Sequence, residues 1–594
     1  MAGTMGGMYV GVTGLMASHN ALNTTAHNLA NVKTTGYSRQ QVLQSDLTYN
    51  KLGVNAISVN QKGLGTRVSS TRQVRDKYLD IEYRKEFSRC KYYQAKYDTF
   101  AEVENYFGET EKTSFQLTMN KFWTSISELQ KEPNSIVARN SLIANASALI
   151  ENATHIYNQM SDYQMDLNTQ VEDSVTKINK LAQKIFDLGI NIVKAEASGS
   201  ESANDMRDAR NQALDELAGI IDIEVREDEI GYIDVYAEDH LLVTVDRTFE
   251  LGTKPISDSN RLLTVYWKVD GTETYHLSRI PNTDEGTDVG SLKGILMARG
   301  GLSTNYTDIP VKPFDSKPIP GQFATNEEYQ NALALWHDYE DKLDTYNTYI
   351  EPCAIPNIMA QFDQLIHGIT TTVNDILCPN TTITAMDGSK YTILDEDAAG
   401  IGMGNGNEFP GTELFVRKGY SRYEKQTISV DDGSGNPVNK TVYVYKEEDP
   451  GDNYSLYTLG ELQINDALLK NPSLLPLSTK DKGENQKVVD QMLQAWSDEF
   501  AALNPNTLVK NNFSNYYADM IGDFSDKAFT CDSIATSQEI MTNEINNQRQ
   551  EVVGTSSDEE LTNLIKFQQA YNASSRYVTA VAEMIEHIIE RLGA

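Results

Sequence analysis

The chain is poor in basic residues and lacks long apolar runs. Its 594 residues include 51 Lys and Arg against 84 Asp and Glu, and the formal net charge is -33. This balance argues against nucleic acid as a partner, because such binding draws largely on Lys and Arg at the phosphates. It also argues against anionic membrane surfaces. No run approaches the roughly 18 consecutive apolar residues of a membrane-spanning helix. We therefore expect no nucleic acid and no membrane among the partners.

Cysteine and histidine are too scarce and too scattered to define a site. The four cysteines form no C-x-x-C pair, which leaves no disulfide framework or zinc site to infer. The eight histidines form no H-E-x-x-H pair, and G-x-S-x-G and G-x-x-x-x-G-K-[ST] are missing. We therefore expect no catalytic residue, no cofactor and no metal. Carboxylate pairs for glycoside hydrolysis remain an alternative in so acidic a chain, although nothing singles out one pair.

The beginning of the chain also lacks basic residues, and Lys33 is the first. A secretory signal peptide needs a charged n-region, and twin-arginine export needs an arginine pair. If the protein leaves the cytoplasm, we expect it to do so without a cleaved signal peptide.

Both ends of the chain instead carry stripes whose members alternate three and four residues apart. This spacing is typical of helices that lie along other helices, as in a coiled coil. An ordinary intramolecular coiled coil would give the same pattern, but the polar His19, Gln568 and Ser575 favour register-specific packing among several helices. We expect a protein that assembles with other chains. The two stripes are Met8, Val12, Leu15, His19, Leu22, Ala26 and Leu29, and Leu561, Leu564, Gln568, Tyr571, Ser575, Val578, Ala582, Ile585, Ile589 and Leu592.

Between the ends, the apolar period changes twice. Helical spacing predicts helices over 72–107 and about 114–131, and then a long rod from Leu142 to Ile192 with one four-residue stutter at Leu167. From about Ile220 the period becomes two, which indicates strands. A helix over about 326–349 interrupts these strands, and helices return from about Gln486. An extended polar segment is expected from the end of the first helix to about Arg72.

We therefore predict a multidomain α+β fold with terminal coiled-coil helices, a long helical bundle and an inserted β-rich outer domain. The N- and C-terminal segments of the bundle pair with each other in this interpretation. The predicted parts are 1–70 (the N-terminal half of an inner coiled-coil domain with the extended segment), 71–219 (the N-terminal part of the bundle), 220–480 (the β-rich outer domain, with a helical insert at about 302–355), 481–555 (the C-terminal part of the bundle) and 556–594 (the C-terminal half of the inner domain).

Three runs of the sequence resemble the bacterial flagellar axial proteins. The first reaches from Gly14-Leu15 through Asn28-Leu29-Ala30-Asn31 to an N-x-x-T-x-G-Y segment that ends in Gly36-Tyr37. The second is the run 558–574, which begins Asp-Glu-Glu-Leu, and the third is the run 207–217, which begins Arg-Asp-Ala-Arg. Within that group, the Ser-Arg-Gln after Tyr37 is similar to the hook-associated protein 1 family, whose members join hook to filament.

The resemblance implies a structural subunit that the flagellar type III export apparatus secretes unfolded. Such a subunit forms a homo-oligomeric ring on the hook protein, outside the cell, at the hook–filament junction of the flagellum. The second junction protein (hook-associated protein 3) and then the filament build onto it. A hook or rod protein is the nearest alternative, although it would lack the long bundle. Flagellin is disfavoured, because its asparagine-rich opening is missing.

The resemblance also assigns candidate interface residues at both ends. The terminal helices are expected to be disordered in the free subunit and to order on assembly, and a flagellar export chaperone is expected on the C-terminal helix, chiefly at Leu564, Tyr571, Val578 and Ile585. The candidates are Leu15, Leu22, Leu29, Asn31, Gly36, Tyr37 and Arg39 at the N-terminal end, and Leu561, Leu564, Gln568, Tyr571, Val578, Ile585 and Leu592 at the C-terminal end.

Overall fold

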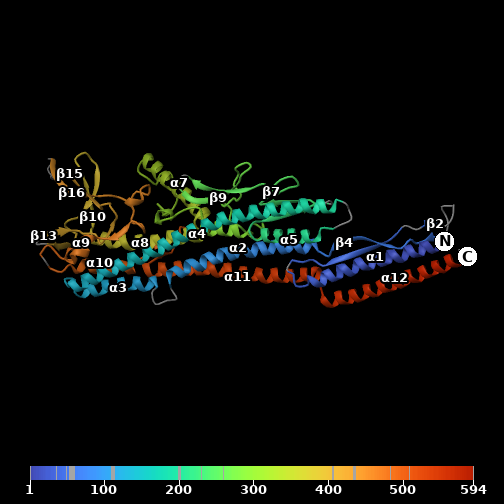
Figure 1. The fold of residues 1–594 in the computed structure, drawn as a ribbon. Helices are drawn as coiled ribbons and strands as arrows, with labels where there is room; N and C mark the ends of the chain where they lie inside the picture. Colours follow the sequence, from blue (N-terminus) through green and yellow to red (C-terminus); the bar gives the residue numbers. More distant parts are fainter. Residues whose placement is uncertain are drawn as a thin grey trace.

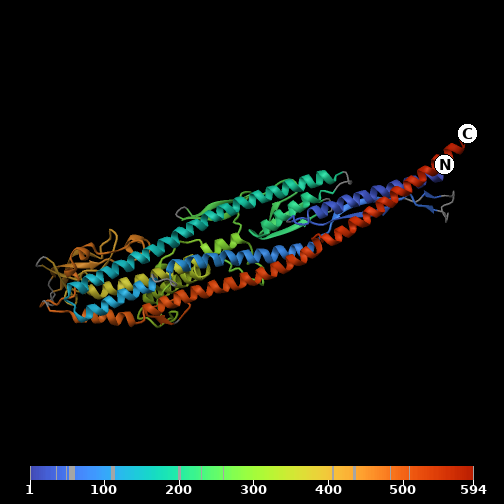
Figure 2. The same ribbon diagram turned by 60° about the horizontal axis from the view of Figure 1, so that its bottom comes forward.

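The molecule is long and narrow, and its two termini lie together at one end (Figure 1). Long helices run beside one another along most of its length, and the strands drawn in yellow to orange gather toward the end far from the termini (Figures 1 and 2). The computed structural model describes residues 2–34, 36–47, 50–51, 61–108, 114–197, 202–228, 231–257, 260–404, 407–431, 437–481, 483–507 and 509–592.

The helices confirm the helical spacing of the sequence. The predicted helices over 72–107, 114–131 and 326–349 are α2, α3 and α7, and the predicted rod lies within α4. The helices are α1 (Ala2–Ala30), α2 (Lys77–Phe107), α3 (Phe115–Lys131), α4 (Ile136–Glu196), α5 (Asn204–Ala218), α6 (Ser291–Arg299), α7 (Asn326–Tyr349), α8 (Ala354–Leu377), α9 (Asp466–Lys470), α10 (Gln486–Ser497), α11 (Phe513–Val553) and α12 (Ser557–Leu592).

Two long helices give the body its length. Helix α4 has 61 residues, and at about 1.5 Å per residue it spans roughly 90 Å. Its buried stripe recurs at helical spacing from Leu142 to Ile192. Helix α11 returns beside α2, and Phe100 of α2 meets Phe524 of α11 with ring centroids 4.9 Å apart. The chain therefore runs outward and comes back, which brings its two ends together.

The strands form small antiparallel sheets rather than one large one. The described sheets include β5-β6-β7 in three strands and β10-β11-β16-β15 in four strands. The strands are β1 (Gln40–Asp46), β2 (Asn50–Lys51), β3 (Gln61–Lys62), β4 (Thr66–Gln73), β5 (Ile223–Glu227), β6 (Ile233–Ala237), β7 (His240–Val243), β8 (Leu251–Ser257), β9 (Asn260–Trp267), β10 (Asn380–Thr384), β11 (Lys390–Leu394), β12 (Ile401–Gly404), β13 (Asn407–Pro410), β14 (Phe415–Arg417), β15 (Tyr423–Asp431), β16 (Pro437–Tyr445), β17 (Leu462–Ile464), β18 (Ala501–Ala502) and β19 (Lys510–Asn511).

Two segments correct the interpretation of the sequence. The stretch after α1 is not a single extended segment, because β1 and β4 pair antiparallel, with Gln40 opposite Gln73 and Asp46 opposite Thr66. The region read as β-rich also contains α8, a helix buried on nearly all sides. Its buried residues include the polar Asn357, Asp363 and Asn374, so its burial does not follow an apolar stripe in the sequence. Pro356 lies in its first turn, where the missing N–H is tolerated.

The fold is thus mixed α+β, with long helices and small sheets. Ile428 and Val430 lie on β15, and Val442 and Val444 lie on the strand that pairs with it, β16, so the two strands form a hairpin. The middle of its turn, 432–436, lies outside the described residues. Among the described helices, none combines the length and apolar character that crossing a bilayer requires.

Candidate assembly interface

Helices α1 and α12 lie side by side in opposite directions at the terminal end (Figures 1 and 2). The face of α1 against α12 is made of glycine: a Cβ added to Gly11 would lie 2.7 Å from Val578 Cγ2. A Cβ on Gly14 would lie 3.2 Å from Ser574 Oγ, and one on Gly7 would lie 3.1 Å from the Tyr577 hydroxyl. The lack of side chains on α1 therefore lets the two backbones approach closely.

This close face, which we call the small-residue seam, continues toward the body at the same three-and-four spacing. All four of the residues that continue it are buried. The seam lies one residue before the predicted apolar stripe at every step. One residue rotates a helix by about 100°. The residues of the predicted stripe therefore lie beside the contact between α1 and α12 and not at its centre. The seam consists of Gly7, Gly11, Gly14, Ser18, Ala21, Thr25 and Asn28.

The outer face of α1 remains apolar and open. The predicted Leu15, Leu22 and Leu29 are only half-buried. Met5 and Met16 are more than 60% exposed. Large apolar side chains on a helix usually lie against another element of structure. In the described part of the chain, α12, β1 and β4 contact α1, and they leave these side chains partly or largely exposed.

Helix α12 divides its predicted residues between two faces. Leu564, Tyr571, Val578 and Ile585 are half-buried on the side of α1, and the Tyr571 ring lies 6.2 Å from the His19 ring. Leu561 and Gln568 are exposed. Leu592 ends the helix, but its side chain lies outside what the structure describes. The exposed large apolar side chains of α12 are Leu561, Ile565, Tyr577, Met584 and Ile589.

A polar cluster, which we call the joint, ties the two helices to the rest of the molecule. Asn28 is 1% exposed and donates from Nδ2 to Glu560 Oε2 at 3.1 Å and to the Gln40 carbonyl at 2.9 Å. Its Oδ1 accepts from the Tyr37 hydroxyl at 2.7 Å and from the Gln40 amide at 3.0 Å. All the hydrogen-bonding groups of the Asn28 amide are thus used at one point. This arrangement fixes where α1 ends and where α12 begins relative to it.

Arg39 completes the joint from the same loop. Its Nε donates to Glu560 Oε1 at 2.9 Å, and its Nη1 lies 3.1 Å from Glu559 Oε2. Its backbone amide donates to the carbonyl of Val553, the last residue of α11, at 2.9 Å. The structure therefore brings the predicted Tyr37 and Arg39 together with the start of α12.

The other two predicted loop residues shape the backbone. Asn31 follows the last turn of α1, and its Nδ2 donates to the His27 carbonyl at 3.0 Å. Gly36 has a φ of +81°, which L residues with a side chain rarely adopt. Asn31 and Gly36 therefore shape the backbone of the loop, and neither contributes a charge to the joint.

Helix α5 anchors the other side of the joint. The Ser38 amide donates to Asp208 Oδ2 at 3.0 Å, and Gln73 Nε2 donates to Asp208 Oδ1 at 2.8 Å. Burial raises the pKa of Asp208, although the hydrogen bonds from Ser38 and the charge of Arg75 oppose the shift. Burial, followed by the nearby carboxylates Asp205, Asp208 and Glu560, raises the pKa of Tyr37. The Tyr37 phenol therefore stays protonated and can donate to Asn28.

The candidate residues named from the sequence leave out three residues that the structure places at or near the joint. Asn28 and Glu560 form its buried centre, and Arg549 pairs with Asp80 at 3.0 Å and Asp215 at 2.8 Å where α11 passes α2. The sequence does hold a signal for Asn28, because a polar residue continues the spacing of Gly7, Gly11 and Gly14. For Arg549 the sequence gives no comparable signal. Across the described ranges, no group of His, Cys, Asp and Glu side chains is arranged to hold a metal ion.

Comparisons with known proteins agree with the arrangement at both ends. The family model "Flagella basal body rod protein" matches residues 8–37, and "Flagellar basal body rod FlgEFG protein C-terminal" matches residues 541–591. These two stretches hold most of α1, the joint loop and α12. Both ends of the chain are therefore similar to proteins of the flagellar basal body rod.

The middle of the chain matches a more specific family model. The model "Flagellar hook-associated protein FlgK helical domain" matches residues 100–310. Flagellar hook-associated protein 1 of Bacillus subtilis (strain 168) is 25% identical over 100% of this chain and 99% of its own length. That of Escherichia coli (strain K12) is 22% identical over 97% and 98%, respectively. Over nearly its whole length, the chain is thus similar to flagellar hook-associated protein 1 of these organisms.

A solved structure is also similar. The flagellar hook junction protein FlgK from Burkholderia pseudomallei matches 79% of this chain and 100% of its own, at 12% identity and a TM-score of 0.47.

Proposed function

We propose that this chain is the junction subunit of the flagellum, a structural adaptor that assembles on the hook tip and on which the filament is built. Its partners would be further copies of itself in a ring, the hook protein below and the second junction protein (hook-associated protein 3) above. The subunit would leave the cell through the type III export apparatus, escorted by an export chaperone on α12.

The observation that carries the proposal is the exposed apolar outer face of the two terminal helices, α1 and α12. The first 32 residues contain no Asp, Glu, Lys or Arg, although the whole chain has a net charge of -33. Met5, Tyr9 and Met16 project from α1, and Met584 and Ile589 project from α12, each more than half exposed. Neighbouring copies would bury these side chains, and each large apolar side chain buried contributes about 1.5–3 kcal/mol.

The composition of α1 supports the same conclusion. Gly3, Gly6, Gly7, Gly11 and Gly14 lie within its first half. Each glycine in a helix interior is about 1 kcal/mol less favourable than alanine. An α1 outside an assembly is therefore a weak helix, and its order depends on packing. This fits a segment that is exported unfolded and becomes rigid only in the junction.

The long bundle favours a junction subunit over a hook or rod protein. The two end matches are common to axial proteins, but the helical-domain match at 100–310 covers all of α3, α4 and α5. A hook or rod protein would lack this 61-residue helix and its partners. A structural role follows, since the proposed work is packing and not catalysis.

Deletion of residues 561–594 tests the proposal. The body keeps its own core, which joins α2, α3, α4, α8, α10 and α11. The truncated protein should therefore remain soluble and melt close to the temperature of the full chain. Cells that make only the truncated protein should carry hooks without filaments in electron micrographs. Normal filaments on such cells would show that α12 is not the assembly element.

A strain that lacks the whole chain provides the control. Bare hooks on this strain, restored to full filaments by the intact gene, would place the protein at the junction. Absence of the hooks themselves would instead point to a rod or hook subunit.

A further inference from the structure

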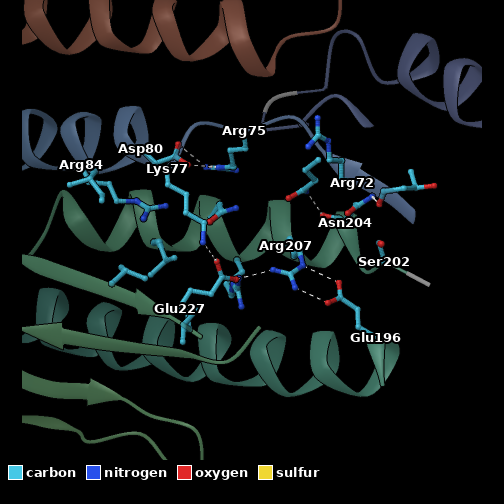
Figure 3. Close-up of a pocket in the computed structure, with 18 residues that line it drawn as sticks. Arg72, Arg75, Lys77, Asp80, Arg84, Glu196, Ser202, Asn204, Arg207 and Glu227 are labelled. Atoms are coloured by element: carbon cyan, nitrogen blue, oxygen red, sulfur yellow. Dashed lines mark hydrogen bonds and ion pairs between the residues drawn. The ribbon is translucent and has the colours of Figure 1, made fainter. Parts of the chain in front are cut away.

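A basic pocket lies next to the joint, between β4, the start of α2, α5 and β5 (Figure 3). It has a volume of about 420 Å³. Its lining holds twice as many cationic as anionic side chains, which is unusual in a chain with a net charge of -33. The cations are Arg72, Arg75, Lys77, Arg84, Arg207 and Arg210, and the anions are Asp80, Glu196 and Glu227.

One carboxylate at the centre of the pocket serves three cations. Glu227 lies 3.0 Å from Lys77 Nζ, 2.8 Å from Arg207 Nη1 and 2.6 Å from Arg210 Nη2. Figure 3 shows Lys77 and Arg207 reaching toward Glu227 from different elements, while Arg207 also reaches Glu196. Outside the lining, Asp215 lies 2.7 Å from Arg84 Nε and Asp208 lies 3.9 Å from Arg75 Nη1, so nearby carboxylates offset part of this positive charge.

Two buried guanidinium groups retain free donors. Arg84 is 8% exposed and Arg210 is 3% exposed, and both line the pocket. Among the described residues, neither Arg84 Nη2 nor Arg210 Nε has a hydrogen-bond partner. A buried donor without an acceptor is unfavourable by about 1–3 kcal/mol, more when it is charged. An incoming oxyanion would relieve this penalty, and carboxylates match the planar fork of arginine.

The chain itself offers carboxylates near the same height along its axis. Arg39 pairs with Glu559 at the start of α12. The next residue, Gln40, lies 3.4 Å from Asp205, and Asp205 follows Asn204, which lines the pocket. Asp558 and Glu559 are exposed in the first turn of α12. Copies related by rotation about an axis parallel to the long helices present their features at equal height. The acidic turn of one copy can therefore face the basic pocket of the next.

We propose that this pocket binds the carboxylate of Asp558 from a neighbouring copy of the chain, while Glu559 stays paired with Arg39 of its own copy. The proposal rests on the proposed function, since it requires the ring. The pocket of one copy would then contact the start of α12 of the next copy at the level of the joint. This contact is separate from the apolar contacts that α1 and α12 would make nearer the termini. Opposite charges at this point would also set the rotational register of adjacent subunits.

A charge exchange tests the contact in living cells. Arg72 is exposed and its side chain bonds only to Gln41 among the described residues, so Arg72→Glu disturbs the fold little. Arg72→Glu and Asp558→Arg should each lower the number of filament-bearing hooks by about tenfold, as close interfacial charges couple strongly. The double variant should recover to within about twofold of the parent. Lys85→Glu, which reverses an exposed cation of α2 outside the pocket, is the matched control and should behave as the parent.

Disulfide trapping gives a second readout. The four native cysteines are buried, so Arg72→Cys with Asp558→Cys introduces the exposed thiols. Mild oxidation of assembled junctions should then produce cross-linked dimers and higher oligomers on a denaturing gel, whereas either single cysteine should not. A double charge variant no better than the single ones, or an oxidised junction without cross-links, would overturn the proposal and reduce the pocket to an internal ion-pair network. Filaments in the strain without the chain would instead refute the proposed function.

Discussion

The buried carboxylate of Glu560 provides the sharpest test of the joint. Its side chain is 2% exposed and bonds to Asn28 Nδ2 and Arg39 Nε. Glu560→Ala removes both bonds and leaves two donors facing an apolar methyl group. Loss of one partner of a buried charged pair typically destabilises by about 3–5 kcal/mol. Since Arg39 is 28% exposed and keeps Glu559, we expect about 2–4 kcal/mol per subunit here.

The neighbouring residue is a natural control. Glu559 is an acidic residue one position away that pairs with the same Arg39 at 3.1 Å, but its side chain is 62% exposed. Pairs of this kind contribute at most about 1 kcal/mol. Glu559→Ala should therefore change little, whereas Glu560→Ala removes a buried carboxylate and its bond to Asn28.

Heating compares the two variants directly. Cells that carry each variant are warmed in steps, and the filaments that remain on hooks are counted in electron micrographs. Glu560→Ala should lose its filaments at a clearly lower temperature than the parent, and Glu559→Ala should follow the parent. Equal behaviour of both variants would refute the claim that the buried bonds of the joint hold α12 in place.

Three further results are expected. Leu22→Asp or Leu564→Asp should abolish filament assembly, because an unpaired charge in a helix interface costs several kcal/mol, and the melting temperature of the purified subunit should barely change; a large drop would mean that the ends already carry the stability of the free chain. Gly11→Ala should impair assembly, because its Cβ would meet Val578 at 2.7 Å, whereas Gly522→Ala, where nothing lies within 4 Å, should be tolerated or slightly stabilising. Burial raises the pKa of Asp363 from 3.8 to about 6. The protonated form therefore stabilises the fold fully below pH 3.8, and this stability, about 3 kcal/mol, is lost as the pH rises to about 6. In urea unfolding, the free energy of unfolding of Asp363→Asn should fall less between pH 4 and pH 7 than that of the parent.

The sequence predicted the long helices well because their apolar stripes are one-sided. Helices α3, α4 and α7 follow the expected ranges closely, and each buries one face against the body. Helix α8 escaped recognition because its residues are buried on nearly all sides, from Ile355 to Leu377. The β1–β4 hairpin escaped because polar residues fill both strands and leave no strong alternation.

The seam of α1 illustrates a different limit. Apolar periodicity selected Leu15, Leu22 and Leu29, but the contact with α12 inside the chain uses Gly7, Gly11 and the glycine and small residues that follow them. A hydrophobic pattern reports the surface that is buried in the final state, whichever chain buries it. Small residues report close approach of backbones instead, and they carry almost no hydrophobic signal. The joint depended on pairing between residues more than 500 positions apart, such as Asn28 and Glu560, which local patterns do not encode.

Hydrogen exchange of the dilute, monomeric protein tests most directly whether the ends are completed by neighbours. Amides of α1 and α12 should exchange rapidly in the free subunit and become protected in assembled junctions, while amides of α2 and α11 should be protected in both. Slow exchange of α1 and α12 in the free subunit, equal to that of α2 and α11, would contradict the account.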